Sequence, residues 1–244
     1  NKFDNIQILL HQHYKCRVGC RVMRKATVET YIKKLLKSEI GKKIGEVLQE
    51  QYKKWKQNLE LKDFYHFIQL IWKKYEREIM KALKGEIQLI GQFRAFAFEE
   101  YVHDLILRKT NLKNLGLNVY WNEPVEVWRG IIIDQGKLVE ETYTTQFDLT
   151  IGKQQENKTI IPLIVIETKV DVDAPRLKAV MANFSLLKTL NPSVSCMLIY
   201  INWNAKKTLK YIAKAVINNI YQFNTEERDE TQKFIQDIIS YLAI

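Results

Sequence analysis

The stretch IPLIVIETKV, from Ile161 to Val170, joins an apolar run to two charged residues. Six of its ten residues are Ile, Leu or Val, a density typical of a buried strand. Glu167 and Lys169 are two positions apart, so their side chains project from the same face of that strand. A buried charge is costly unless it is paired or bound to a ligand. The end of this strand is therefore predicted to be a binding site.

A second carboxylate is expected beside this strand. Asp148 lies in the stretch TTQFDLTIG, from Thr144 to Gly152, which the turn GKQQENKT joins to the first stretch. If the two strands pair, Asp148 reaches Glu167, and two close carboxylates repel each other unless a divalent cation binds between them. Oxygen ligands favour Mg²⁺ or Mn²⁺ over zinc, and a lysine beside such an ion can hold or deprotonate a water molecule aimed at a phosphate. The alternative is an ion pair between Glu167 and Lys169 at the protein surface.

The patterns along the rest of the chain predict an α/β fold. Residues 24–84 space their apolar residues by three and four, as amphipathic helices do. Residues 117–170 are rich in Val, Ile, Thr, Tyr and Trp, which predicts three or four strands in a meander. A helix over 174–191, with Asp173 as its cap, followed by a strand over 193–203 implies a right-handed crossover and parallel pairing. Further helices are expected at 92–110, 205–221 and 225–242.

Three features together resemble the PD-(D/E)XK nuclease superfamily. Asp148 on one strand is followed nineteen positions later by Glu167, with Lys169 two residues beyond it on an apolar strand. A glutamate lies on the helix before both strands. The first motif departs from the nominal Pro-Asp, because Phe147 precedes Asp148.

The resemblance implies a particular architecture. Residues 91–244 would form a restriction-endonuclease-like core, in which a central mixed β-sheet is flanked by helices. Residues 1–90 would form a basic helical region for DNA binding or dimerisation. The helix glutamate of the superfamily corresponds to Glu99, with Glu100 as the alternative, because helix phase read from sequence is uncertain by about one residue.

The resemblance also implies a chemistry for the strand ends, the hydrolysis of phosphodiester bonds in double-stranded DNA. Asp148, Glu167 and the backbone carbonyl of Thr168 would bind Mg²⁺, for which Mn²⁺ can substitute. Lys169 would position the attacking water, and the products would carry 5′-phosphate ends.

The size of the chain and its lone nuclease core favour a type II restriction endonuclease within that superfamily. Because cutting both strands of a duplex usually needs two active sites, a homodimer or a related partner subunit is expected. A repair, transposon-end or junction-resolving nuclease would show the same site residues. A non-catalytic nucleic-acid-binding protein is the alternative from a different class.

The net charge of +10 is concentrated in the first third of the chain. Residues 1–90 hold 20 Lys and Arg against 10 Asp and Glu, whereas residues 91–244 hold 18 of each. Such asymmetry points to nucleic acid or another anionic surface. Basic residues among aromatics suit phosphate contacts and base stacking, but the aromatics can equally form a buried stripe beside solvated lysines. The candidate DNA contacts are Lys53, Lys54, Lys73 and Lys74, which lie beside Tyr52, Trp55, Trp72 and Tyr75, together with Arg176 and Lys178.

The remaining cysteine and histidine positions leave one question open. His11, His13, Cys16 and Cys20 are possible zinc ligands, although structural zinc sites usually split their ligands into two separated pairs. Cys196 is expected to be a buried hydrophobic residue, and three cysteines suggest no disulfide framework. No apolar stretch approaches the roughly eighteen residues needed to cross a membrane. The expected compartment is the cytoplasm.

Overall fold

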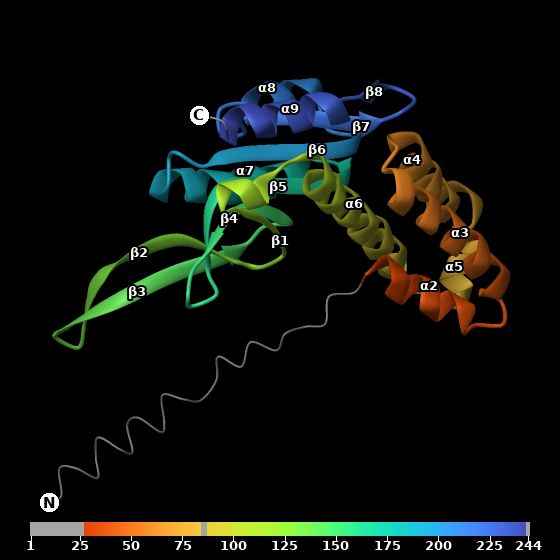
Figure 1. The fold of residues 1–244 in the computed structure, drawn as a ribbon, viewed down its shortest axis with the longest axis horizontal. Helices are drawn as coiled ribbons and strands as arrows, with labels where there is room; N and C mark the ends of the chain where they lie inside the picture. The colour runs from red at the N-terminus through yellow and green to blue at the C-terminus, as the bar shows by residue number, and fades with distance from the viewer. Residues whose placement is uncertain (1–26, 84–86, 243–244) are drawn as a thin grey trace, which may run out of the picture.

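The structure, a computed structural model, describes residues 27–83 and 87–242 (Figure 1). The possible zinc ligands His11, His13, Cys16 and Cys20 lie outside these residues. The described part of the basic N-terminal region is helical, as predicted. Its elements are α2 (Val28–Leu36), α3 (Lys42–Asn58), α4 (Leu61–Gln69), a π-helical turn (Leu70–Lys74) and α5 (Glu76–Ala82).

A mixed sheet flanked by helices follows, which confirms the predicted fold class. The sheet has the strand order β1-β4-β5-β6-β7-β8, and β2 pairs with β3 and with β5. Its strands are β1 (Asn118–Trp121), β2 (Pro124–Asp134), β3 (Lys137–Gln146), β4 (Leu149–Gln154), β5 (Ile160–Val172), β6 (Ser195–Trp203), β7 (Asn219–Asn224) and β8 (Arg228–Asp229). The remaining elements are α6 (Ile87–Lys109), a 3₁₀ turn (Leu112–Leu115), α7 (Ala174–Leu190), α8 (Lys207–Ala213) and α9 (Thr231–Leu242).

Strand β5 lies between an antiparallel and a parallel neighbour. The ladder with β4 ends where Leu149 pairs with Ile166, so the last part of β5 continues beyond its β4 partner. On its other side β5 pairs in parallel with β6 along its whole end, as the predicted crossover through α7 requires. The Asp173 side chain accepts a hydrogen bond from the Arg176 backbone N–H at 2.9 Å, which confirms Asp173 as the cap of α7.

Two hydrophobic clusters cover the two faces of the sheet. One joins helices α2 to α6 and α9 to sheet residues such as Ile166 and Ile199. The other packs α7 and α8 against residues such as Val165 and Leu198. The first cluster is continuous from the N-terminal helices to the sheet, so these helices and the sheet share one hydrophobic core. A functional division near residue 90 stays a prediction.

The aromatic residues of the N-terminal helices differ in their exposure to solvent. Tyr52 and Trp55 are buried, which confirms the alternative of a buried stripe for these two. Trp72 is exposed, and the guanidinium of Arg94 lies 4.1 Å from the centre of its ring. Cys196 is buried, as predicted. Among the described residues, no helix has the length and apolar character that crossing a membrane would need.

The predicted helix over residues 205–221 is wrong beyond α8, which ends at Ala213. Residues 219–224 instead form β7, which pairs in parallel with the open edge of β6. Tyr221 and Phe223 are buried in the cluster that contains α6. The spacing of the apolar residues in this segment is compatible with a helix. The segment forms a strand because β6 supplies hydrogen-bond partners for its backbone, and a local sequence pattern does not reveal such partners. The helix predicted from residue 225 begins only at Thr231.

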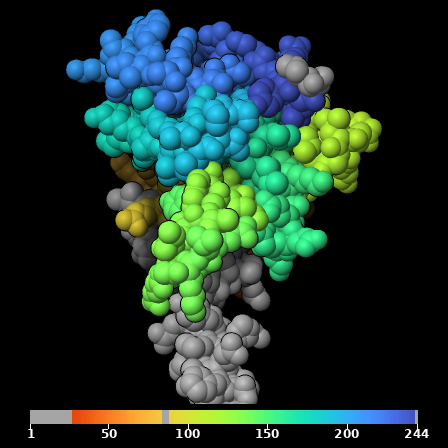
Figure 2. Space-filling view, turned by 90° about the vertical axis from the view of Figure 1, so that its left-hand side faces the viewer, coloured from red at the N-terminus to blue at the C-terminus, as the bar shows by residue number. Residues whose placement is uncertain are grey.

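A long β-hairpin, β2–β3, is inserted between β1 and β4 and projects from the body of the protein (Figures 1 and 2). The turn at its end contains Gln135 and Gly136, both with positive φ, at 48° and 76°. Such a two-residue turn matches the twist of antiparallel strands, and Gly136 adopts it without strain.

Two glycine substitutions test the packing of this fold. A Cβ at Gly152 would lie 2.1 Å from the backbone oxygen of Ile161, so Gly152→Ala should destabilise the protein by about 1–3 kcal/mol. Gly91 lies in α6, and a Cβ there would meet no atom within 4 Å. Gly91→Ala should therefore stabilise the protein by up to about 1 kcal/mol. Urea unfolding of both variants measures these changes, and equal effects would contradict the packing described for β4 and β5.

Candidate active site

Asp148, Glu167 and Lys169 converge where the β4–β5 ladder ends. The Lys169 ammonium nitrogen, Nζ, donates to Asp148 Oδ2 at 2.9 Å and to Glu167 Oε2 at 2.6 Å. The two carboxylate oxygens are therefore separated by no more than the sum of these distances, 5.5 Å. All three side chains are largely withdrawn from solvent. They do not form an exposed ion pair at the protein surface, which was the alternative.

Thr168 completes the contacts around Asp148. Its backbone N–H donates to Asp148 Oδ2 at 2.7 Å, and its hydroxyl lies 3.2 Å from the same oxygen. The N–H and C=O of one residue in a strand point to the same edge. The Thr168 carbonyl thus faces the edge that β4 has left open and at which Asp148 lies.

Glu99 and Glu100, adjacent on α6, face different parts of the molecule. Glu99 is buried close enough to Asp148 and Lys169 for their charges to act on its ionisation. Glu100 accepts hydrogen bonds from the Tyr52 hydroxyl at 2.6 Å and from Lys56 Nζ at 2.9 Å, both on α3. Glu99 therefore lies on the side of the strand ends, and Glu100 fastens α6 to the N-terminal helices.

Two residues that the sequence analysis missed hold Glu99 in place. Trp121 Nε1 and Asn122 Nδ2 donate to Glu99 Oε2 at 2.6 and 2.9 Å. Asn122 also donates its backbone N–H to the backbone oxygen of Asp148 at 3.1 Å. Its φ of 51° is left-handed, a conformation that Asn adopts more readily than most residues. The only signal in the sequence is the Asn-Glu-Pro turn after Trp121.

The comparisons with known proteins identify the fold and nothing finer. No protein-family model and no curated protein matches the chain. Among solved structures, the chain is similar to the native BbvCI A2B2 tetramer, with a TM-score of 0.50 and 11% sequence identity. The similarity covers 81% of this chain and 86% of that chain. BbvCI is a type II restriction endonuclease.

The chain has a restriction-endonuclease fold. At this level of identity the similarity concerns the fold, and a function has to be argued from the site.

Burial and neighbouring charges shift the pKa values of three groups at this site. Burial, together with the charge of Asp148, raises the pKa of Glu167 to about 7. The same two causes raise the pKa of Glu99 to about 7. Burial alone would lower the pKa of Lys169, but the charges of Asp148 and Glu167 outweigh it and raise that pKa above its ordinary value. Lys169 is therefore an ammonium at neutral pH.

The donors at this site fit a hard divalent cation. Two carboxylates and a backbone carbonyl, from Asp148, Glu167 and Thr168, are oxygen ligands of the kind that Mg²⁺ prefers. Burial, and after it the charge of Asp148, raises the pKa values of Glu99 and Glu167, so a bound cation would favour the ionised form of both groups. In the part of the chain that the structure describes, no three His, Cys, Asp or Glu side chains form a metal cluster by themselves. A cation here would depend on the backbone carbonyl and on water for its further ligands.

Arg94 links α6 to the end of β5. Its guanidinium donates to Asp171 Oδ2 at 2.9 Å, and the other carboxylate oxygen accepts from Asn202 of β6 at 2.8 Å. Arg94 is buried, and its face lies against Trp72 of the π-helical turn. The strand that carries Glu167 and Lys169 is thus fixed at its end by a residue of α6.

The predicted DNA contacts are spread over three elements. Lys53 of α3 and Lys73 and Lys74 of the π-helical turn are exposed, whereas Lys54 pairs with Asp63 at 2.7 Å. Arg176 and Lys178 are exposed on α7, on the other side of the sheet from α3 (Figure 1).

The excess positive charge of the first third of the chain is divided equally between residues 27–83 and residues 1–26. Residues 27–83 hold 13 Lys and Arg against 8 Asp and Glu, a net of +5. Residues 1–26 hold 6 against 1, also a net of +5, and lie outside the described part. The described helices therefore carry half of the excess.

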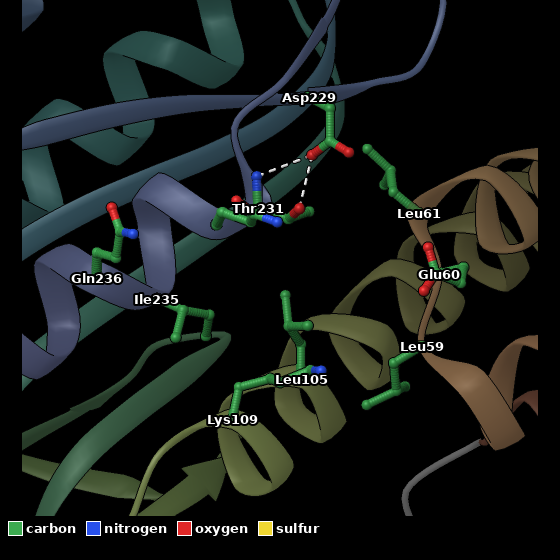
Figure 3. Close-up of a pocket in the computed structure, with 10 residues that line it drawn as sticks. Leu59, Glu60, Leu61, Leu105, Lys109, Asp229, Thr231, Ile235 and Gln236 are labelled. Carbon is green, nitrogen blue, oxygen red and sulfur yellow. Dashed lines mark hydrogen bonds between the residues drawn. The ribbon is translucent and has the colours of Figure 1, made fainter.

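A pocket of about 420 Å³ lies away from these residues (Figure 3). It is bounded by the loop between α3 and α4, by α6 and by the start of α9, where Asp229 accepts hydrogen bonds from Thr231. None of Asp148, Glu167 and Lys169 lines it. Its mixture of aliphatic side chains with Glu60 and Lys109 offers no arrangement that suggests a reaction.

The pKa of Glu167 predicts how the stability of the metal-free protein depends on pH. A carboxyl whose pKa is raised in the folded state binds protons more tightly there than in the unfolded chain. The stabilisation from this tighter proton binding is complete below the pKa of Glu167 in the unfolded chain, near 4.5. It is lost as the pH rises through the pKa of the folded state, about 7. The melting temperature in EDTA should therefore fall between pH 5 and pH 8.

Glu167→Gln should reduce this fall, by on the order of 5 °C. Glu46→Gln, which changes an exposed carboxyl on α3, should leave the fall unchanged. Thermal melts of the unmodified protein and the two variants, at matched ionic strength, measure the fall in melting temperature. The assignment fails if Glu167→Gln melts with the same pH dependence as the unmodified protein.

Proposed function

We propose that this protein is a Mg²⁺-dependent endonuclease that hydrolyses phosphodiester bonds of double-stranded DNA and leaves 5′-phosphate ends. Sequence-specific restriction cleavage is the form of this activity that the fold favours. The observation that carries the proposal is the shared Lys169 ammonium, in contact with Asp148 and Glu167 at adjacent strand ends. Two carboxylates and one ammonium buried together are costly in a hydrophobic core, but they are the groups that would bind a cation and a phosphate.

Asp148, Glu167 and the Thr168 carbonyl would hold Mg²⁺. When bound, the ion supplies positive charge to the phosphate and lowers the pKa of a water molecule. Binding of the cation would favour the ionised form of Glu167, whose pKa is otherwise raised by burial. Asp148 is held for this purpose by the Thr168 N–H and by the Asn122 N–H on its backbone oxygen.

Lys169 would act as a hydrogen-bond donor and a positive charge. Because its pKa is raised, it does not lose its proton readily and is poorly suited to serve as the general base. A cation would take over the neutralisation of the two carboxylates, and the ammonium could then orient the attacking water and stabilise charge on the phosphate. Glu99, held by Trp121 and Asn122, would position water close to the same centre.

A second subunit is part of the proposal. Hydrolysis of both strands of a duplex at one site calls for two active centres, and the described residues of this chain contain one such trio. The similar BbvCI structure is an A2B2 tetramer. A homodimer or a complex with a related partner subunit would supply the second centre.

Cleavage of plasmid and phage DNA tests the proposed reaction. The protein should give discrete fragments with Mg²⁺ and none with EDTA. Lys169→Ala and Glu167→Ala should each lower the cleavage rate by at least about 10²-fold, because each removes a group that acts on the phosphate or the ion. Lys153→Ala, an exposed lysine on β4, is the matched control and should cleave normally.

Near-normal cleavage by either site variant would refute the mechanism. Tight DNA binding by the unmodified protein, without cleavage under any divalent cation, would favour the non-catalytic alternative.

The salt dependence of DNA binding tests the basic helices. Each phosphate that a lysine neutralises contributes about −0.9 to the slope of log K against log salt concentration. Replacing Lys53, Lys73 and Lys74 by Gln should therefore flatten the slope by up to about 2.7. Lys54→Gln alone should change it less, because Lys54 is paired with Asp63. An unchanged slope in the triple variant would mean that these lysines do not contact DNA.

A further inference from the structure

The end of the β2–β3 hairpin carries an apolar face. Ile131, Ile133 and Leu138 are 70%, 75% and 76% exposed. Ile133 lies opposite Leu138 in the strand register, and Ile131 is two residues from Ile133, so the three side chains project from one face of the hairpin. We call these three residues the tip face. Figure 2 shows the hairpin standing in front of the body of the protein, and Figure 1 shows that its end reaches away from the sheet.

The opposite face of the hairpin is partly covered by its own residues. Ile132 lies opposite Val139, and both are only 38% exposed. The Trp128 ring lies over Gly130, where a Cβ would come within 2.3 Å of it. The hairpin therefore shields one of its faces with an aromatic ring and leaves the other in solvent.

The hairpin has little support from the rest of the sheet. Strand β3 pairs only with β2, and β2 meets the main sheet only where Val125 pairs with Ile160. A two-stranded ribbon is at best marginally stable by itself in water. An exposed strand edge with large apolar side chains is also a strong site for association with another chain. The tip face thus has the properties of a surface that is covered in the assembled protein.

The charges at the end of the hairpin favour a second copy of the same chain. The charged residues beside the tip face balance one another: Asp134 lies opposite Lys137, and Glu140, opposite Ile131, accepts a hydrogen bond from Arg129 at 3.2 Å. A neutral apolar surface has no attraction for the phosphates of DNA. Two such ends related by a two-fold axis would bury their apolar faces and could place Asp134 of each copy against Lys137 of the other.

We propose that the tip face, formed by Ile131, Ile133 and Leu138, is a contact surface for a second copy of this chain. The contact is isologous, so that the same hairpin end contributes from both protomers. This proposal goes beyond cleavage and does not depend on it, because it follows from exposure, register and charge alone.

Sedimentation equilibrium of the full chain tests the proposal without DNA. The unmodified protein should form a dimer at micromolar concentration. The triple variant Ile131→Thr, Ile133→Thr and Leu138→Thr should dimerise at least about tenfold more weakly, because threonine keeps the strand preference but removes apolar contact area. The matched control, Ile161→Thr with Leu163→Thr, changes two exposed apolar residues of β5 and should dimerise normally.

Amide hydrogen exchange of the unmodified protein gives a reading that needs no variant. Protection of residues 131–139 should rise as the protein concentration is raised through dimerisation. A monomeric unmodified protein, or a triple variant with an unchanged dimer dissociation constant, would overturn the proposal. Lys169→Ala should dimerise normally, so that loss of cleavage and loss of pairing are read separately.

Discussion

The ammonium of Lys169 bonds two carboxylates that could not share so small a space without a positive charge. Asp148 and Glu167 are largely buried, and burial together with the charge of Asp148 raises the pKa of Glu167. Lys169 Nζ contacts both and partly offsets that repulsion. The surrounding strands keep this contact: β4 begins at Leu149, one residue after Asp148, and β5 continues beyond its pairing with Leu149 to present Glu167 and Lys169 at the same edge.

Helix α6 connects the candidate site at the strand ends to the N-terminal helices. Glu99 faces the strand ends, while the next residue, Glu100, bonds to Tyr52 and Lys56 of α3. One turn earlier Arg94 reaches Asp171 at the end of β5. The N-terminal helices are therefore coupled to the site by hydrogen bonds as well as by apolar packing.

The sequence predicted those features that depend on short-range periodicity. The alternation around Glu167 and the turn length after Asp148 were enough to place both carboxylates and Lys169 at one edge, and the fold class followed from the order of the patterns. The role of Asn122 could not be predicted, because it depends on a left-handed turn. The bond between Arg94 and Asp171 spans 77 positions and has no local signal. Strand β7 was missed for the same reason, since its partner is an edge of β6.

The β2–β3 hairpin begins and ends at the candidate site. It leaves the sheet directly after Asn122, which bonds both Glu99 and the backbone of Asp148, and it returns two residues before Asp148. The hairpin is thus attached at both of its ends to residues beside Asp148 and Glu99, so a partner that held its far end would restrict the movement of the two segments that border the candidate site.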